Sequence, residues 1–281
     1  MRVKYLYSSR LTGHIENLKK QRQKYPDLLL KVVDTSDIIL EVLDARFFEE
    51  MRNPEIEHII KSQGKKIIYV LNKSDLVSQE KIKKSALEKI MPYVFISCVK
   101  RRGVKDLRDK IKQLAKSVKK DEEHKHDRIQ VGIIGYPNTG KSSITNVLIG
   151  HMSAGVGAEA GYTKGVQKLK LTKEILLLDS PGVIPARDYS QHDEEKILKH
   201  QKVGGKSFSQ IKDPEVLVAN LLKDYQEQIE EYYKIKAHND AELLIEELGK
   251  KKGFLKRKGE VDEDKTSRLI IKDFQEGKIK I

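Results

Sequence analysis

The sequence has few of the features that mark secreted or membrane-spanning proteins. Among its 281 residues there is one cysteine, Cys98, which excludes an internal disulfide framework and is typical of a reducing compartment. No apolar run approaches the roughly 20 residues needed to cross a bilayer. No apolar core follows the charged residues at the N-terminus. We therefore expect a cytoplasmic protein with no membrane partner, long enough for one large or two modest domains.

Acidic residues are too few to balance the basic ones. Lysine and arginine number 55 against 42 for aspartate and glutamate, which gives a formal net charge of +13. Residues 200–281 hold 17 basic and 16 acidic side chains, so nearly all of the excess lies in the first 199 residues. Basic residues cluster at 19–24, 100–120 and 250–258. Any one cluster is equally well explained as a solvated face, but together they predict an RNA partner, and we expect no DNA partner.

A phosphate-binding loop is predicted at residues 135–142, which read Gly-Tyr-Pro-Asn-Thr-Gly-Lys-Ser. The apolar run 129–134 precedes it and a segment with helical spacing, 141–149, follows, so a strand, a loop and a helix N-terminus line up. Backbone N–H groups would wrap a phosphate, Lys141 would neutralise it, and the Ser142 hydroxyl would ligate Mg²⁺. The expected nucleotide contacts are Pro137, Asn138, Thr139, Gly140, Lys141, Ser142 and Ser143. A chance glycine turn before a lysine is the alternative, which the other motifs make improbable.

Two further elements are expected around the γ-phosphate. The apolar run 174–178 leads to Asp179, a carboxylate at a strand end, and then to Gly182, whose N–H can turn towards the phosphate. A threonine must also close on the phosphate and Mg²⁺. Thr163, with glycines on both sides, is preferred over Thr172 and Ser153, although it could instead end a turn. The predicted Mg²⁺ ligands are Ser142, Thr163 and Asp179, and the predicted catalytic contacts are Lys141, Thr163 and Gly182.

The identity of the bound base is predicted from the tetrapeptide Asn72-Lys73-Ser74-Asp75, which follows the apolar run 66–71. Asp75 can accept hydrogen bonds from the paired donors N1–H and N2–H₂ of guanine, whereas adenine would leave it facing no donor pair. Asn72 would brace the loop and the base, and the stem of Lys73 would cover the ring face. Backbone N–H groups would reach the base O6 from Ser97, Cys98 and Val99. By itself the tetrapeptide is equally a surface turn, but beside the phosphate loop it selects GTP.

The guanine motif precedes the phosphate loop, which reverses the order of an ordinary GTPase. The order indicates a circularly permuted GTPase, with the charged segment 119–127 joining the old chain ends. We predict an α/β P-loop GTPase domain at 1–185, a mostly parallel sheet with helices on both faces. A small all-helical domain at 186–281 should follow and bind RNA. Its helices are predicted at 214–233, 240–248 and 265–274.

With these motifs the chain resembles the circularly permuted ribosome-biogenesis GTPases of the YlqF/YawG type over nearly its whole length. Asp44-Ala45-Arg46 and Arg52-Asn53-Pro54 match the family's element ahead of the guanine motif. Gly13-His14-Ile15 is similar to the family's Gly-His-Met, although Arg10-Leu11-Thr12 stands where the family has an aromatic residue and a proline. The run 260–281 resembles its RNA-binding end. The resemblance implies a GTP-hydrolysing switch that binds rRNA and acts on the large ribosomal subunit or its precursor.

Hydrolysis is expected to be slow and to be stimulated by a ribosomal particle. Val183 stands where a glutamine would orient the attacking water. By resemblance to related GTPases, Asn138 helps to hold K⁺ near the β- and γ-phosphates, and His14 places the water. The alternatives are that Asn138 only shapes its loop and that His14 is a solvated or RNA-facing imidazole.

Nucleotide state should control the helical domain. Contacts from Thr163 and Gly182 to the γ-phosphate would order the junction, and hydrolysis would release it. Val183 favours a different interpretation, an RNA-binding assembly factor with structural GTP and negligible turnover. A GTPase acting on another RNA, such as tRNA, is also open. An ATP-dependent RNA enzyme would require Asp75 to be irrelevant.

Overall fold

The computed structural model describes residues 27–118, 128–150, 166–180, 201–205, 207–257 and 259–281. A six-stranded sheet with the strand order β3-β2-β1-β4-β6-β5 forms its centre. The strands are β1 (Ile38–Asp44), β2 (Lys66–Asn72), β3 (Tyr93–Phe95), β4 (Ile129–Ile134), β5 (Gln167–Lys170) and β6 (Ile175–Asp179). All neighbours pair in parallel except β5, which is antiparallel to β6. The predicted mostly parallel sheet is confirmed.

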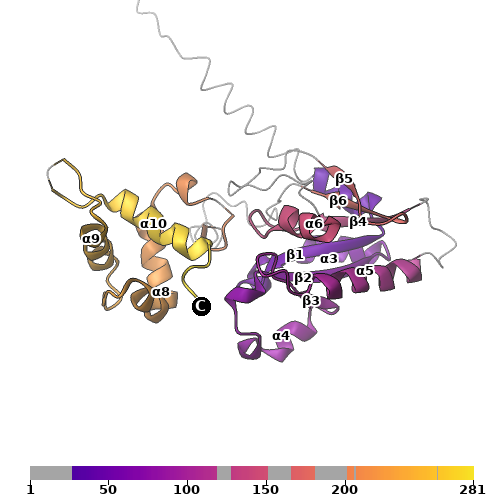
Figure 1. Cartoon of the computed structure of the whole chain (residues 1–281), viewed down its shortest axis with the longest axis horizontal. Helices are drawn as coiled ribbons and strands as arrows, with labels where there is room; N and C mark the ends of the chain where they lie inside the picture. The colour runs from indigo at the N-terminus through magenta and orange to yellow at the C-terminus, as the bar shows by residue number, and fades with distance from the viewer. Residues whose placement is uncertain (1–26, 119–127, 151–165, 181–200, 206, 258) are drawn as a thin grey trace, which may run out of the picture.

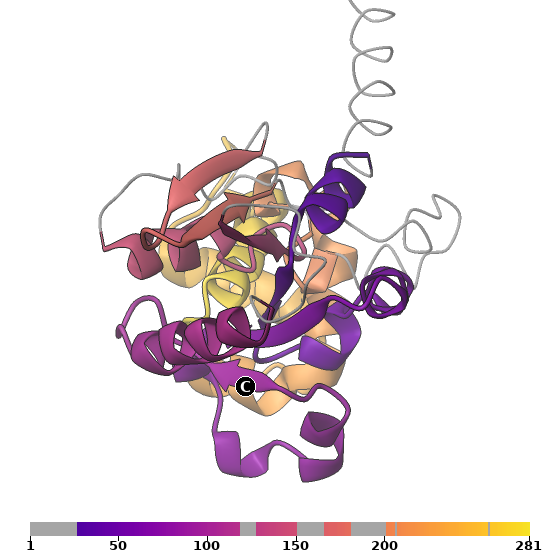
Figure 2. The ribbon, with the colours of Figure 1, turned by 90° about the vertical axis from the view of Figure 1, so that its right-hand side faces the viewer.

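Helices cover both faces of the sheet because its central strands are buried on both sides. All seven residues of β1 are buried, which is the pattern of a parallel strand with two covered faces. Ile38, Leu40 and Val42 pack with α5 (Val104–Val118) and α6 (Lys141–Ile149). The other face packs with residues 27–35, which are helical, and with α2 (Phe48–Met51) and α3 (Pro54–Ser62). Figure 2 shows the strands between these two helical layers.

Three α-helices whose full length is described follow the sheet: α8 (Pro214–Tyr233), α9 (Ala241–Lys252) and α10 (Glu263–Gln275). They pack on one another through a buried apolar set: Leu217, Leu221, Leu244, Leu248, Ile270 and Phe274. Asp240 and Asp262 cap two of the helices by accepting hydrogen bonds from the N–H groups of Leu243 and Lys265. The predicted helical C-terminal part is confirmed, while the predicted boundary at residue 185 lies outside the described residues.

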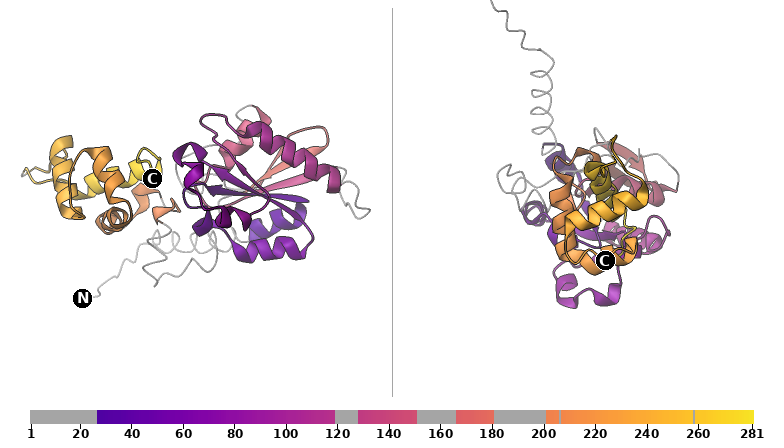
Figure 3. Two further views of the ribbon diagram at one scale, coloured as in Figure 1. Left: turned by 90° about the horizontal axis from the view of Figure 1, so that it is seen from below. Right: turned by 90° about the vertical axis from the view of Figure 1, so that its left-hand side faces the viewer.

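The three helices lie beside one end of the sheet, and the C-terminus lies on their side that faces it (Figures 1 and 3). Phe47, just before α2, lies 6.0 Å from Phe274 of α10 between ring centroids. These side chains belong to one continuous apolar cluster that includes residues of β1, β2 and α8. No helix in the described ranges has both the length and the apolarity to cross a bilayer.

Candidate nucleotide-binding site

The phosphate loop joins the end of β4 to the first residue of α6, as the sequence predicts. Both glycines of this loop are required by the close approach of neighbouring atoms. At Gly135 (φ +143°) an added Cβ would lie 2.3 Å from the carbonyl oxygen of Val42, and at Gly140 (φ +92°) it would lie 2.2 Å from Nδ2 of Asn72. No side chain fits at either position without displacing a neighbouring strand end or the guanine motif. The backbone is therefore free to approach an anion at the N-terminus of α6.

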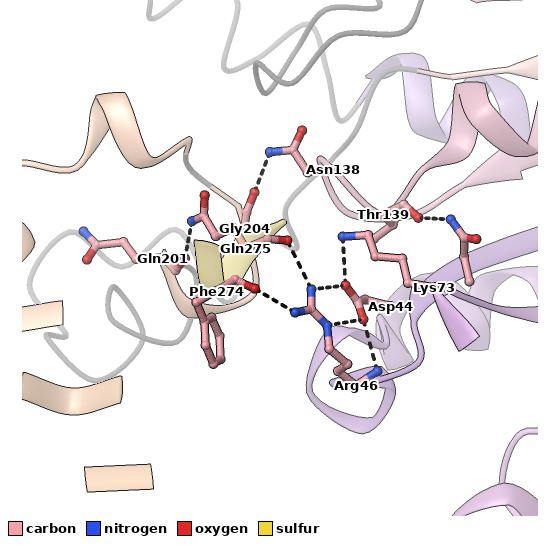
Figure 4. Close-up of polar contacts among 10 residues, drawn as sticks. Asp44, Arg46, Lys73, Asn138, Thr139, Gln201, Gly204, Phe274 and Gln275 are labelled. Carbon is pink, nitrogen blue, oxygen red and sulfur yellow. Dashed lines mark hydrogen bonds and ion pairs between the residues drawn. The ribbon is translucent and has the colours of Figure 1, made fainter. Parts of the chain in front are cut away.

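A hydrogen bond ties the guanine motif to this loop. Nδ2 of Asn72 donates to the carbonyl oxygen of Thr139 at 2.8 Å (Figure 4). Oδ1 of Asn72 is buried and has no hydrogen-bond partner within the described part of the chain. Because unpaired buried acceptors are costly, this oxygen is suited to a donor that a bound nucleotide or a water would supply. Asn72 thus contacts the phosphate loop, and its contact with a base stays a prediction.

Lys141 is a buried cation, and no carboxylate among the described residues forms an ion pair with it. Its side chain is 7% exposed, and Nζ donates to the carbonyl oxygen of Tyr136 at 2.7 Å. Burial lowers the pKa of Lys141 to about 8, although the charge of Asp179 opposes this shift. A phosphate at the loop would supply the missing negative charge. The position and the charge of Lys141 therefore suit the phosphate contact predicted for it.

Ser142 and Asp179 come together at the start of α6. The Ser142 hydroxyl donates to Oδ2 of Asp179 at 3.0 Å. Asp179 is fully buried, its Oδ1 has no hydrogen-bond partner among the described residues, and burial raises its pKa despite the charge of Lys141. A hydroxyl and an orphaned carboxylate oxygen are the hard ligands that Mg²⁺ prefers. These two residues fit a Mg²⁺ ion, which would neutralise charge on a bound phosphate.

The guanine end of the site is built from the turn after β2 and the loop after β3. Lys73 adopts a left-handed conformation (φ 58°, ψ 33°), and Asp75 lies in the 3-10 turn Ser74–Leu76. The loop after β3 closes through the pairing of Ser97 with Arg102. Burial, with the nearby charge of Asp75, raises the pKa of the Cys98 thiol to about 12. Ser74 N–H also donates to the carbonyl oxygen of Ile96 at 3.1 Å, which joins the turn that holds Asp75 to the start of the loop expected to contact the base O6. Val99 of this loop is 87% exposed.

Several predicted residues lie outside the described part of the chain. His14, Thr163 and Gly182 lie outside the described residues, and Ser153 and Val183 do as well. Their roles stay predictions. Asn138 (φ 60°) is in place in the loop, and its Nδ2 donates to the carbonyl oxygen of Gly204 at 2.9 Å. Its amide is therefore held by a segment that the sequence did not associate with the phosphate loop.

Asp44 and Arg46 also contact the site. In the sequence they matched a family motif but had no assigned role. Oδ2 of Asp44 lies 2.9 Å from Nζ of Lys73 and 2.8 Å from Nη2 of Arg46. One signal was available, since Asp44 ends β1 as Asn72 ends β2. The two residues are in register, and parallel neighbours present their carboxyl ends at one edge of the sheet.

The strand order shows a circularly permuted arrangement of the fold. The strand that carries the guanine motif, β2, precedes the phosphate-loop strand β4 in the chain, and β1 separates them in the sheet. The solved structure of YlqF from T. maritima in its GNP-bound form shares this fold with a TM-score of 0.63 at 22% identity, covering 91% of this chain and 94% of that one. The chain thus shares the circularly permuted P-loop fold of YlqF.

Sequence comparisons find similarity to GTP-binding proteins. The family described as 50S ribosome-binding GTPase matches residues 130–247. The GTP-binding protein MJ1464 of Methanocaldococcus jannaschii is 40% identical over 250 residues, which are 89% of this chain and 64% of that protein. Nucleolar GTP-binding protein 2 of Saccharomyces cerevisiae is 35% identical over 268 residues, 93% of this chain and 53% of that protein. The chain thus spans between half and two thirds of the length of these two relatives.

Proposed function

We propose that the protein is a GTP-binding and slowly GTP-hydrolysing switch that binds rRNA in the assembly of the large ribosomal subunit. The observation that carries the proposal is the hydrogen bond from Asn72 to Thr139, because it joins a guanine-reading motif to a phosphate loop in one site. The proposed contacts to the base are Asn72, Lys73, Asp75 and the backbone of residues 97–99. The GTPase domain would comprise residues 1–185 and the RNA-binding domain residues 186–281, in the cytoplasm.

Hydrolysis would depend on positioned charge, since phosphoryl transfer needs little else from the protein. Lys141 would contact the β- and γ-phosphates. Ser142 and Asp179 would hold Mg²⁺ with Thr163, and the Gly182 N–H would meet the γ-phosphate. Val183 in place of a water-orienting glutamine supports a slow rate, and His14 is the proposed replacement.

A K⁺ ion at Asn138 is the second proposed aid to hydrolysis. Gly204 accepts a hydrogen bond from Nδ2 of Asn138, so Oδ1 of the same amide points away from Gly204 (Figure 4). A carbonyl oxygen held in a fixed direction is a suitable ligand for a monovalent cation. K⁺ there would neutralise charge as the phosphoryl group transfers.

The RNA-binding surface is proposed on exposed lysines and arginines. Lys250, Lys251 and Lys252 end α9, and Lys256 and Arg257 follow in the next turn, all of them exposed. A second group lies on α5. Its exposed members are Lys105, Lys112 and Lys116. Similarity to a 50S ribosome-binding GTPase family and to a nucleolar GTP-binding protein supports a large-subunit rRNA as the target.

GTP turnover in matched KCl and NaCl, with and without purified large ribosomal subunits, tests the proposal. The Lys141→Ala variant supplies the background rate. We expect slow turnover that rises with subunits and with K⁺, and competition by GDP but not by ADP. A rate that stays at the Lys141→Ala background throughout, with GTP still bound, would instead support the second candidate that Val183 favours, an RNA-binding assembly factor with structural GTP. Stimulation by tRNA but not by subunits would redirect the proposal to another RNA.

A further inference from the structure

The carboxyl end of α10 contacts the guanine motif through a single arginine. Nη1 of Arg46 donates to the carbonyl oxygen of Phe274 at 2.8 Å, and Nη2 donates to that of Gln275 at 3.3 Å. The same guanidinium binds both carboxylate oxygens of Asp44, with Nε to Oδ1 at 3.0 Å and Nη2 to Oδ2 at 2.8 Å. Asp44 in turn holds Nζ of Lys73 at 2.9 Å. Figure 4 shows this chain of contacts from Lys73 to the end of α10.

Burial makes these contacts depend on one another. The side chains of Arg46 and Asp44 are 3% and 1% exposed. Burial would raise the pKa of the Asp44 carboxyl, but the charges of Lys73 and Arg46 overcome that effect and hold the pKa well below its ordinary range. A buried carboxylate that serves two cations is sensitive to the position of either one. Movement of Lys73 therefore changes how strongly the Asp44 carboxylate attracts Arg46, and movement of Arg46 changes how strongly it attracts Lys73.

The helix end is itself a suitable partner for a cation. The last carbonyl groups of a helix lack intrahelical partners and carry the negative end of its dipole. Arg46 binds that end, and its Cζ lies 5.0 Å from the centroid of the Phe47 ring. The planar fork of arginine can bind a carboxylate and two carbonyl oxygens at once, which lysine cannot do.

A second contact joins the residues after α10 to the guanine motif. Gly277 (φ +76°) lies so close to Leu76 that an added Cβ would be 2.2 Å from Leu76 Cδ1. Leu76 directly follows Asp75, the residue expected to accept the guanine donors. The turn after α10 therefore packs against the guanine motif as well as binding it through Arg46.

The same helix end also reaches the phosphate loop. Nε2 of Gln275 donates to the carbonyl oxygen of Gln201 at 2.9 Å, and Gly204 N–H donates to that same oxygen at 3.2 Å. The carbonyl oxygen of Gly204 accepts from Nδ2 of Asn138. Asn72 binds Thr139, the neighbour of Asn138. The end of α10 is therefore connected to the guanine motif through Arg46 and Asp44, and to the phosphate loop through the residues 201–204.

We propose that Arg46 is a positioning residue for guanine recognition, acting through Asp44 on Lys73, and that the turn after α10 thereby responds to an occupied base site. The inference rests on the proposed function, because it requires a guanine nucleotide beneath the stem of Lys73. A bound base fixes Lys73, the fixed ammonium fixes Asp44, and Arg46 then holds the Phe274 and Gln275 carbonyl groups more firmly. Coupling of this kind is reciprocal, so loss of Arg46 must also weaken nucleotide binding.

Two backbone amides report the state of this turn. Gly277 N–H donates to the carbonyl oxygen of Phe274, which also accepts from Arg46, and Lys278 N–H donates to the carbonyl oxygen of Asp273. Neither amide belongs to a nucleotide-binding motif. Hydrogen exchange at Gly277 and Lys278, measured on the full chain with and without GDP, therefore reads the coupling separately from binding.

The test compares Arg46→Gln with a matched control, Arg52→Gln. Arg52 also makes a two-point contact with a buried carboxylate, that of Glu57, whereas Arg46 binds both the carboxylate of Asp44 and the end of α10. In the wild type we expect GDP to slow exchange at both amides. In Arg46→Gln we expect the slowing to disappear and GDP to bind about fivefold more weakly. Arg52→Gln should keep the slowing and bind GDP within about twofold of the wild type.

Two further variants keep the test decisive if Arg46→Gln does not fold. Arg46→Lys retains a cation beside Asp44 but lacks the fork, and it should show the same loss of GDP response. Lys73→Met leaves the contacts between Arg46 and α10 in place, and at saturating GDP it should also lose the response.

Different failures are distinguishable. A wild-type chain that binds no GDP contradicts the proposed function. Normal GDP binding with unchanged exchange at Gly277 and Lys278 overturns the coupling, and so does an Arg46→Gln variant that behaves as Arg52→Gln does.

Discussion

Asn72 donates its side-chain amide to the carbonyl oxygen of Thr139 at 2.8 Å, across 67 positions of sequence. This hydrogen bond joins the motif predicted to read the base to the loop predicted to hold the phosphates. It also explains the residue between Thr139 and Lys141, because only glycine leaves room for the Asn72 amide there.

Gly140→Ala should therefore disrupt nucleotide binding. The added Cβ would lie 2.2 Å from Nδ2 of Asn72, at a backbone φ of +92° that alanine tolerates poorly. We expect GDP affinity to fall by about tenfold or more and the free energy of unfolding to fall by about 1–2 kcal/mol. Gly150→Ala is the matched control, since φ is +86° and nothing lies within 4 Å of the added Cβ. Calorimetric GDP titration should show Gly150→Ala unchanged in affinity, and equal losses in the two variants would contradict the explanation.

Nucleotide binding should take up a proton at mildly alkaline pH. The pKa of Lys141 is about 8 instead of 10.5 because burial disfavours its charge, with Asp179 opposing the shift. A bound phosphate favours the ammonium form and raises this pKa, so the complex holds more protons than the free protein between about pH 8 and 10.5. GDP affinity should accordingly fall as the pH rises above 8.

Calorimetry of GDP binding at about pH 8.5, in two buffers of different ionisation enthalpy, measures this proton directly. The Lys141→Arg variant is the control, since an arginine stays protonated throughout. Equal apparent enthalpies in both buffers for the wild type would rule out the proton uptake.

Glu41→Gln should stabilise the protein at alkaline pH. Glu41 is buried in β1, and burial, together with the charge of Glu57, raises its pKa from 4.5 to about 8. The folded state keeps a proton that the unfolded state releases between pH 4.5 and 8, so the wild-type free energy of unfolding falls as the pH rises through this window. Glutamine cannot ionise, and Asn53 N–H can still donate to its oxygen as it does to Oε1 of Glu41.

The expected gain of Glu41→Gln over the wild type is a few kcal/mol at pH 8 and little at pH 5. Denaturant unfolding at the two pH values measures it. Glu57→Gln is the control with the opposite sign, because Arg52 and Tyr69 both donate to that carboxylate. A Glu41→Gln gain that does not depend on pH would refute the assignment of this titration to Glu41.

Ser142→Ala should raise the Mg²⁺ concentration needed for tight GTP binding, on the order of tenfold. The Ser142 hydroxyl and the orphaned Oδ1 of Asp179 are the oxygen ligands that the described site offers to the ion. Asp179→Asn should have a larger effect, because it removes a charge. A Mg²⁺ titration of GTP affinity tests both variants, and GDP binding in EDTA should change little in Ser142→Ala. Unchanged Mg²⁺ dependence in both would remove these residues from the metal site.

Sequence patterns predicted the helices well and their ends less well. The predicted helix 214–233 agrees with α8, although Tyr225 (φ −137°, ψ 36°) kinks it. Helix α9 runs past the predicted end at 248 to Lys252, because lysines are favourable near a helix C-terminus and the left-handed Gly253 then stops it. Helix α10 begins at Glu263, two residues before its predicted start, because Asp262 caps it.

The sequence by itself determined the nucleotide-binding motifs, their reversed order and the mostly parallel sheet. It did so because buried parallel strands require apolar runs, and phosphate and guanine contacts require particular side chains at fixed spacing. Only the tertiary structure decided which residues the end of α10 contacts. Arg46 meets the Phe274 carbonyl group across 228 positions. Every residue type carries a backbone carbonyl group, so the side chains at 274 and 275 could not predict this contact from the sequence.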